Sequence, residues 1–160
     1  TKTKAELDAF INWINEHQPF LEKEGLTLHY HNHSEEFLPN DDGEIAFYEL
    51  EKRTNILFEI DTFWAFVAGK DPVEVITRLK DRVHVIHLKD GIACKPEHRS
   101  WHCSGEGVIG RSVGTGEAPV LAVRQWCLDN GVRMVIESEG LDPTGPAEVK
   151  RCIEFLRTLD

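Results

Sequence analysis

Residues 83–91 read Val-His-Val-Ile-His-Leu-Lys-Asp-Gly, a mainly apolar run that ends on ionisable side chains. Three other short apolar runs lead in the same way to a carboxylate. The four runs with their terminal candidates are Leu26–Asn32 leading to Glu36, Ile56–Asp61, Val83–His87 and Val132–Glu137. Parallel-barrel enzymes gather their chemistry at the C-terminal ends of the strands. The pattern therefore predicts a parallel α/β fold together with a functional rim.

Helical patterns separate these runs, so one helix followed by four βα units is expected. The first helix should begin at the capping-box residues Thr3–Glu6 and end before Gly25. The other expected helices are Glu44–Arg53, Asp71 to about Asp81, Ala118–Asn130 and a last one from Gly145 onward. Lys89–Thr115 shows little periodicity and is expected to form a long loop on the functional side.

Four βα units are half of a (β/α)8 TIM barrel, which typically needs about 250 residues. The chain has 160 residues, and its first helix follows no strand. The expected fold is therefore the C-terminal half of such a barrel, as one domain over residues 1–160. Four parallel strands would leave two open edges, which predicts a homodimer or another association that completes the barrel.

The composition excludes several classes of protein. The net charge is −10, which argues against a nucleic-acid partner. No apolar run approaches the roughly 20 residues of a membrane span, and the polar start lacks a signal-peptide pattern. The four cysteines are too few and too scattered for a disulfide scaffold. A cytoplasmic, reduced protein is the expectation.

Several ordered segments resemble the xylose isomerase-like TIM barrel family, the sugar phosphate isomerase/epimerases. These segments are residues 29–37 (HYHNHSEEF), 59–64 (EIDTFW), 68–72 (AGKDP), 82–91 (RVHVIHLKDG), 113–117 (VGTGE) and 135–139 (VIESE). The resemblance extends over nearly the whole chain. The order and spacing of the segments are specific for the superfamily but not for a substrate.

The resemblance implies a metal ion held by Glu36, Asp61, His87 and Glu137, with His31, His33 and Lys89 facing the substrate. For the first carboxylate two alternatives stay open. Glu35 is a neighbour that could substitute for Glu36. In some family members this carboxylate lies within the strand, at a register near His29 here.

The residue pattern supports a site independently of the resemblance. His31 and His33 share one face of a strand and suit hydrogen bonding to sugar hydroxyls, although metal-ligand and structural roles remain alternatives. Lys89 and Asp90 follow His87 directly, and ionisable groups at a strand end suggest a site in which Asp90 contacts substrate. Trp64 is expected to form an apolar wall for a sugar, with a core position as the alternative.

Glu, Asp, His and Glu make a hard, oxygen-rich site for one divalent ion, such as Mn, Mg, Co or Zn. The predicted function is a metal-dependent isomerase or epimerase of a small sugar or polyol. It would remove a proton next to a carbonyl through an enediolate. Glu36 and Glu137 would transfer protons on opposite sides of the ion, and Lys89 would stabilise oxyanion charge or donate a proton.

Other functions remain open. An inositol or keto-sugar dehydratase of the same superfamily and a truncated, non-catalytic sugar-binding remnant are the main alternatives. The acidic charge disfavours a phosphodiesterase of the endonuclease IV type. A second zinc cluster of Cys94, His98, His102 and Cys103 has suitable ligands but no standard spacing, so an ordinary loop or a lid is favoured.

Overall fold

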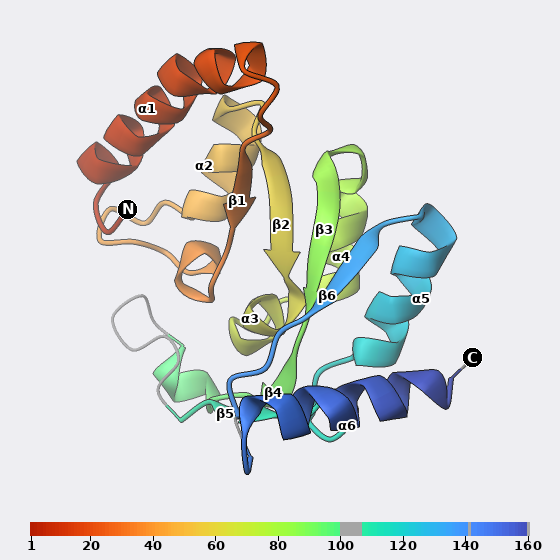
Figure 1. Cartoon of the computed structure of the whole chain (residues 1–160). Helices are drawn as coiled ribbons and strands as arrows, with labels where there is room; N and C mark the ends of the chain where they lie inside the picture. Colours follow the sequence, from red (N-terminus) through yellow and green to blue (C-terminus); the bar gives the residue numbers. More distant parts are fainter. Residues whose placement is uncertain (100–106, 141, 160) are drawn as a thin grey trace.

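A parallel sheet of four strands forms the centre of the computed structural model, which describes residues 1–99, 107–140 and 142–159. The strand order is β1-β2-β3-β6, and every neighbouring pair is parallel (Figure 1). The strands are β1 (His29–His31), β2 (Leu57–Asp61), β3 (Val83–Leu88) and β6 (Arg133–Ile136). This arrangement confirms the expected α/β architecture of half a barrel.

The main helices connect these strands or flank them. They are α1 (Lys4–Lys23), α2 (Ala46–Arg53), α4 (Pro72–Arg78), α5 (Val120–Asn130) and α6 (Gly145–Arg157). The capping box predicted at the start of α1 is present, because the Thr3 side chain accepts from the Glu6 backbone and Glu6 reciprocates. Gly131 ends α5 in the left-handed conformation at a φ of 67°. No described helix combines the length and the apolar composition of a membrane span.

Three parts of the chain differ from the expectations. A short helix, α3 (Thr62–Val67), follows β2 directly, where the apolar sequence has no helical period. The expected long loop contains an antiparallel pair, β4 (Asp90–Ile92) and β5 (Ile109–Arg111). In addition, β1 covers only the end of the predicted run Leu26–Asn32. The remaining short turns are the 3-10 helices η1 (Glu35–Phe37), η2 (Lys80–Arg82) and η3 (Pro96–His98).

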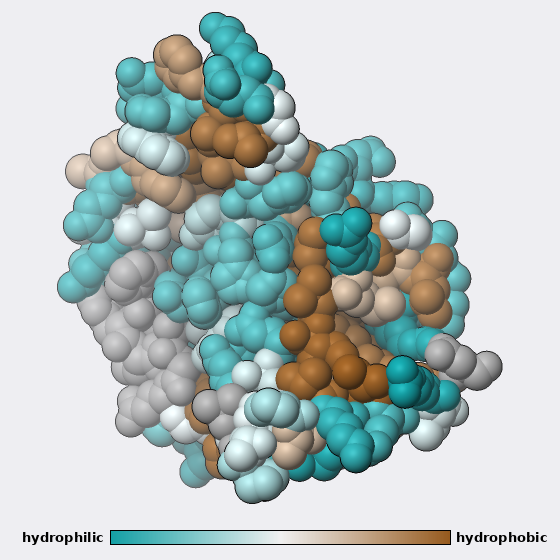
Figure 2. All heavy atoms as spheres, viewed as in Figure 1, coloured by the Kyte–Doolittle hydropathy of each residue, from teal (hydrophilic) through white to brown (hydrophobic). Residues whose placement is uncertain are grey.

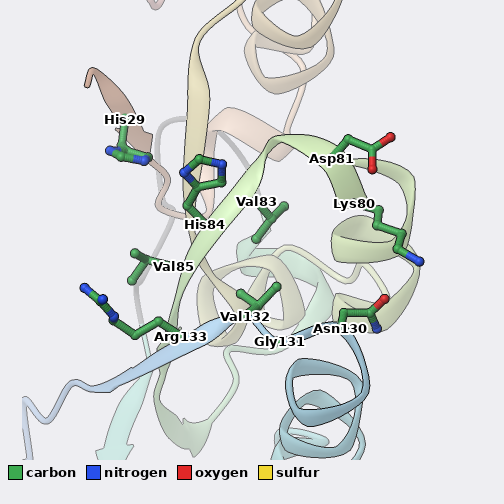
Figure 3. A pocket seen from close by; sticks show the side chains of 10 residues that line it. All are labelled: His29, Lys80, Asp81, Val83, His84, Val85, Asn130, Gly131, Val132 and Arg133. Carbon is green, nitrogen blue, oxygen red and sulfur yellow. The ribbon is translucent and has the colours of Figure 1, made fainter. Parts of the chain in front are cut away.

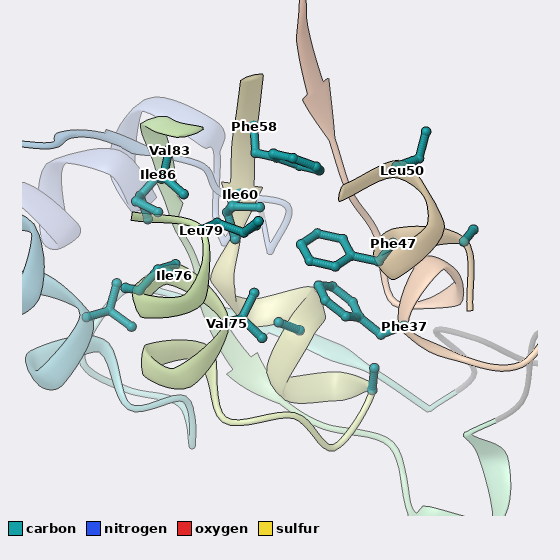
Figure 4. Packing of buried hydrophobic residues seen from close by; sticks show 14 of the residues in the cluster. Phe37, Phe47, Leu50, Phe58, Ile60, Val75, Ile76, Leu79, Val83 and Ile86 are labelled. Atoms are coloured by element: carbon teal, nitrogen blue, oxygen red, sulfur yellow. The ribbon is translucent and has the colours of Figure 1, made fainter. Parts of the chain in front are cut away.

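The core lies between one face of the sheet and the helices that cover it. Phe58 and Ile60 of β2 and Ile86 of β3 are fully buried on this face (Figure 4). Phe37 and Phe47 extend the core toward α2, with ring centroids 4.2 Å apart. Because side chains alternate along a strand, this packing places Glu59, Asp61 and other polar residues on the opposite face.

The opposite face of the sheet is open. Figure 2 shows a hydrophobic band over the edge strand β6 beside a hydrophilic area over the neighbouring strands. Val135 of β6 is 42% exposed. Within the described residues, β1 and β6 each pair with a single strand, so the sheet has two free edges.

Candidate active site

Four side chains from neighbouring strands meet at the C-terminal ends of the sheet. His31 comes from β1, Asp61 from β2, His87 from β3 and Glu137 from the residue after β6. Each offers one ligand atom, and these atoms all lie within 4.8 Å of one another. The structure thus brings together three of the four predicted metal ligands and adds His31.

Within the described residues, two atoms of this cluster are buried without a hydrogen-bond partner. They are Asp61 Oδ2 and His31 Nδ1. Asp61 is fully buried, and its other oxygen, Oδ1, accepts from the Trp64 backbone N–H at 3.0 Å. A buried polar atom without a hydrogen bond is costly, and a bound cation would offset that cost. Two imidazoles and two carboxylates are a donor set that suits a divalent transition metal. The residues present therefore fit a metal ion.

His87 lies between two carboxylates. Its Nδ1 contacts Glu137 Oε2, and its Nε2 lies 2.5 Å from Glu59 Oε1. Burial alone would lower the pKa of His87, but hydrogen bonds to Glu59 and Glu137 outweigh burial, so this pKa is raised. Sequence reasoning missed Glu59. The available signal was its position two residues before Asp61, which places both side chains on one face of β2.

Lys89 brings a buried positive charge to the cluster. Its Nζ lies 2.7 Å from Glu139 Oε2, 3.2 Å from Glu137 Oε1 and 3.8 Å from Asp61 Oδ2, and the side chain is only 1% exposed. Burial raises the pKa of Asp61 to about 6, although the positive charge of Lys89 acts to lower it. Burial also acts to raise the pKa of Glu137, but Lys89 and His87 outweigh it, so the pKa of Glu137 is lowered.

Trp64 and His33 form a wall beside the cluster. Their ring centroids lie 5.6 Å apart, and the His33 ring lies 5.0 Å from that of His31. The Lys89 ammonium lies 4.7 Å from the centroid of the Trp64 ring. Trp64 Nε1 is buried and has no hydrogen-bond partner among the residues that the structure describes, so it is an available donor in this wall.

Glu36 lies outside the cluster of four. Its Oε1 accepts from the Tyr30 hydroxyl at 2.9 Å, and its Oε2 accepts from the His33 backbone N–H at 2.7 Å. It belongs to a second group of possible ligand atoms together with His33 and Glu35. Burial raises the pKa of Glu36, helped by the nearby charge of Glu35.

Asp90 is buried and holds a loop. Its carboxylate accepts from the backbone N–H groups of Gly91, Gly114, Gly116 and Ala118, at 2.8 to 3.1 Å. The approach is close, because a Cβ on Gly116 would lie 2.2 Å from Asp90 Oδ1. These bonds connect residues 114–118 to the start of β4, on the side of the sheet where the cluster lies.

Comparisons with known proteins found several similar solved structures. Two are sugar phosphate isomerase/epimerases from Parabacteroides distasonis, with TM-scores of 0.73 and 0.75 and identities of 22% and 23%. A third is a xylose isomerase domain protein from Planctomyces limnophilus, with a TM-score of 0.70 and 17% identity. The chain shares the fold of these barrel proteins. Between 95% and 98% of this chain is covered, but only 51% to 55% of each matched chain. Neither the protein-family models nor the curated proteins searched match the chain.

A cavity lies at the other end of this half barrel. It has a volume of about 680 Å³ and is lined by residues at the starts of the strands, among them His29, His84 and Arg133 (Figure 3). Barrel enzymes place their chemistry at the C-terminal ends of the strands, where the cluster of four lies. We therefore do not take this cavity as the active site.

The second zinc candidate is only partly described. Cys94 is buried, and His98 ends η3. His102 and Cys103 lie outside the described residues, so this possibility stays a prediction.

Proposed function

We propose that this chain carries the metal centre of a sugar or polyol isomerase or epimerase. The observation that supports this most is the convergence of His31, Asp61, His87 and Glu137 at the C-terminal ends of four neighbouring strands. Two of these residues carry a buried atom that has no hydrogen-bond partner in the described part of the chain. The matched structures, sugar phosphate isomerase/epimerases and a xylose isomerase domain protein, are named for the same class of activity.

These four residues are the proposed ligands of one divalent ion. Among Mn, Mg, Co and Zn, two imidazoles favour Zn, Co or Mn over Mg. When bound, such an ion supplies Lewis acidity to a substrate carbonyl. In this proposal His31 takes the place that the sequence prediction gave to Glu36. His31 Nδ1 accepts no hydrogen bond from the described residues, whereas both Glu36 oxygens accept one.

Glu137 is the proposed base that removes a proton next to the carbonyl. Lys89 and His87 hold its pKa below the ordinary value, so the carboxylate is ionised at neutral pH and able to accept a proton. The Lys89 ammonium, 3.2 Å from Glu137 Oε1, would then face the negative charge that develops on the substrate oxygen.

The substrate would lie against His33 and Trp64. The free Trp64 Nε1 can donate to a sugar hydroxyl, and the indole face can pack against sugar C–H groups. Glu36 has a different proposed role, which is to orient His33 by accepting from its backbone N–H. Asp90, whose carboxylate is engaged by the loop, would shape the pocket without touching the substrate.

Activity of the whole enzyme is a further proposal, because the chain spans about half the length of the matched structures. The two free edges of the sheet and the exposed face beside β6 would be covered in a closed barrel. We propose that a second half barrel, a copy of this chain or another polypeptide, completes the site. Light scattering on the protein as it elutes from a size-exclusion column measures its mass, which distinguishes a dimer of this chain from a chain that needs another polypeptide.

Solvent exchange tests the proposed reaction without knowing the sugar. The metal-loaded protein is incubated in D₂O with a panel of hydroxy-ketones and hydroxy-aldehydes, and deuterium at carbon is followed by NMR. An isomerase or epimerase incorporates deuterium, whereas a dehydratase releases water and forms a dehydrated product. Glu137→Gln should abolish exchange. Glu154→Gln, which changes a carboxylate that is 60% exposed, should leave exchange unchanged. Metal binding without exchange on any substrate would favour the non-catalytic remnant.

A further inference from the structure

Glu59 contacts His87 at the ring nitrogen opposite the one that contacts Glu137. Its Oε1 lies 2.5 Å from His87 Nε2, while His87 Nδ1 contacts Glu137. Glu137 belongs to the group of four possible ligands, and Glu59 does not. The two ring nitrogens therefore face different partners, with Nδ1 directed at the candidate metal site.

A histidine can bind a metal only through a nitrogen that carries no proton. The hydrogen bond made by the second nitrogen decides which one that is, and it also holds the ring in place. A carboxylate on Nε2 keeps the proton there and leaves the lone pair of Nδ1 for the metal. Rotation of the ring by half a turn would break this bond, so the bond selects one ring orientation.

We propose that Glu59 is a positioning residue that holds the proton of His87 on Nε2 and thereby prepares Nδ1 to bind the metal. This rests on the proposed function, since it assumes the metal site. In the described structure Lys89 forms ion pairs with Asp61, Glu137 and Glu139. It therefore does not compete with His87 for the Glu59 carboxylate. The His31 ring, with its centroid 4.5 Å from that of His87, further limits the space for a rotated imidazole.

Two substitutions separate the hydrogen bond from the charge. Glu59→Ala removes both, whereas Glu59→Gln removes the charge and keeps a carbonyl oxygen that can accept from Nε2–H. Glu51→Gln and Glu51→Ala are the controls, because Glu51 carries the same charge and pairs with Arg78 on the helical side. Zn²⁺ and Co²⁺ affinities of the full chain are measured by calorimetry after removal of metal with a chelator.

Glu59→Ala should weaken metal binding by about 10- to 100-fold, the range for loss of such an outer partner. Glu59→Gln should recover most of this loss, and the Glu51 variants should bind like the wild type. In the Zn²⁺-loaded wild type, ¹⁵N NMR of the histidines should show a proton on Nε2 of His87 that exchanges slowly. In Glu59→Ala this proton should exchange rapidly.

Two results would overturn the inference while leaving the metal site intact. One is a Glu59→Ala variant that binds metal as tightly as the Glu51 variants. The other is a His87 that carries its proton on Nδ1 and binds through Nε2. If the folded wild type binds neither Zn²⁺ nor Co²⁺, the proposed metal site itself fails, and the role of Glu59 fails with it.

Discussion

Asp61 and His87 are direct partners in the parallel register of β2 and β3. The register places a carboxylate beside an imidazole at the same end of the sheet, and β1 and β6 add His31 and Glu137 on either side. Asp61 is the most buried member of the four, at 0% exposure. Its properties therefore give the sharpest tests of the site.

Asp61→Asn should reduce divalent metal affinity by at least about 100-fold, since a ligand carboxylate is lost at the centre of the cluster. The fold should persist, because an asparagine Oδ1 can still accept from the Trp64 backbone N–H. Calorimetric titration with Mn²⁺, Co²⁺ and Zn²⁺ measures this. Asp129→Asn, on the exposed side of α5, is the control, and equal binding by the two variants would exclude Asp61 as a ligand.

The stability of the metal-free chain should depend on pH through Asp61. Its folded pKa of about 6 lies above the unfolded value of about 3.9, so the protonated form is favoured by folding. The contribution of Asp61 is fully present below about pH 3.9 and is lost as the pH rises through about 6. At neutral pH the loss amounts to about 3 kcal/mol.

In the Asp61→Asn variant the side chain at this position does not titrate, so it adds no pH dependence to the free energy of unfolding. The free energy of unfolding of this variant, relative to the wild type, should therefore increase between about pH 4.5 and about pH 7.5. Urea denaturation of both metal-free proteins at the two pH values checks this, and contributions from other titrating groups largely cancel in the difference. A difference that stays constant, or that decreases with pH, would contradict the assignment.

Lys89→Met should destabilise the metal-free chain. The buried ammonium pairs with Glu139, Glu137 and Asp61, and its removal leaves their charges uncompensated, at a cost of about 2–4 kcal/mol. Added Zn²⁺ should restore part of this stability, because it replaces the missing positive charge. Lys150→Met, at a lysine that is 74% exposed, serves as the control in thermal unfolding. Similar melting temperatures for both variants would contradict the role of Lys89 as the central counter-charge.

Asp90→Ala should lower the free energy of unfolding by about 2–4 kcal/mol, since four backbone N–H groups lose their acceptor. Metal affinity should stay close to the wild-type value, because Asp90 lies outside the group of four. Urea denaturation and calorimetry on one preparation give both quantities. A stable Asp90→Ala protein with weakened substrate binding would instead support the substrate contact expected from the sequence.

Part of this structure was predictable from local patterns in the sequence. The strand Val83–Leu88 and the capped start of α1 have the predicted positions, because apolar runs and capping residues act locally. The helix α3 was missed because Thr62–Val67 is short and almost wholly apolar. The β4-β5 pair was also missed, since it joins residues far apart in the chain.

For the candidate site, too, the sequence predicted the residues with a local signal and missed the contacts between distant segments. Asp61, His87 and Glu137 were recognisable because each ends an apolar run. The choice between His31 and Glu36 depends on where β1 ends and how the chain turns in η1, which sends Glu36 back to Tyr30. The contact between Glu59 and His87 depends on the pairing of β2 with β3, which the sequence of either strand alone does not contain.

We propose that His31, Asp61, His87 and Glu137 together bind one divalent metal ion. Anomalous diffraction at the zinc or manganese edge, from crystals grown with that ion, tests it most directly. A single strong anomalous peak enclosed by these four side chains is expected. A peak held instead by His33, Glu35 and Glu36, or a saturated crystal with no peak among the four residues, would contradict it.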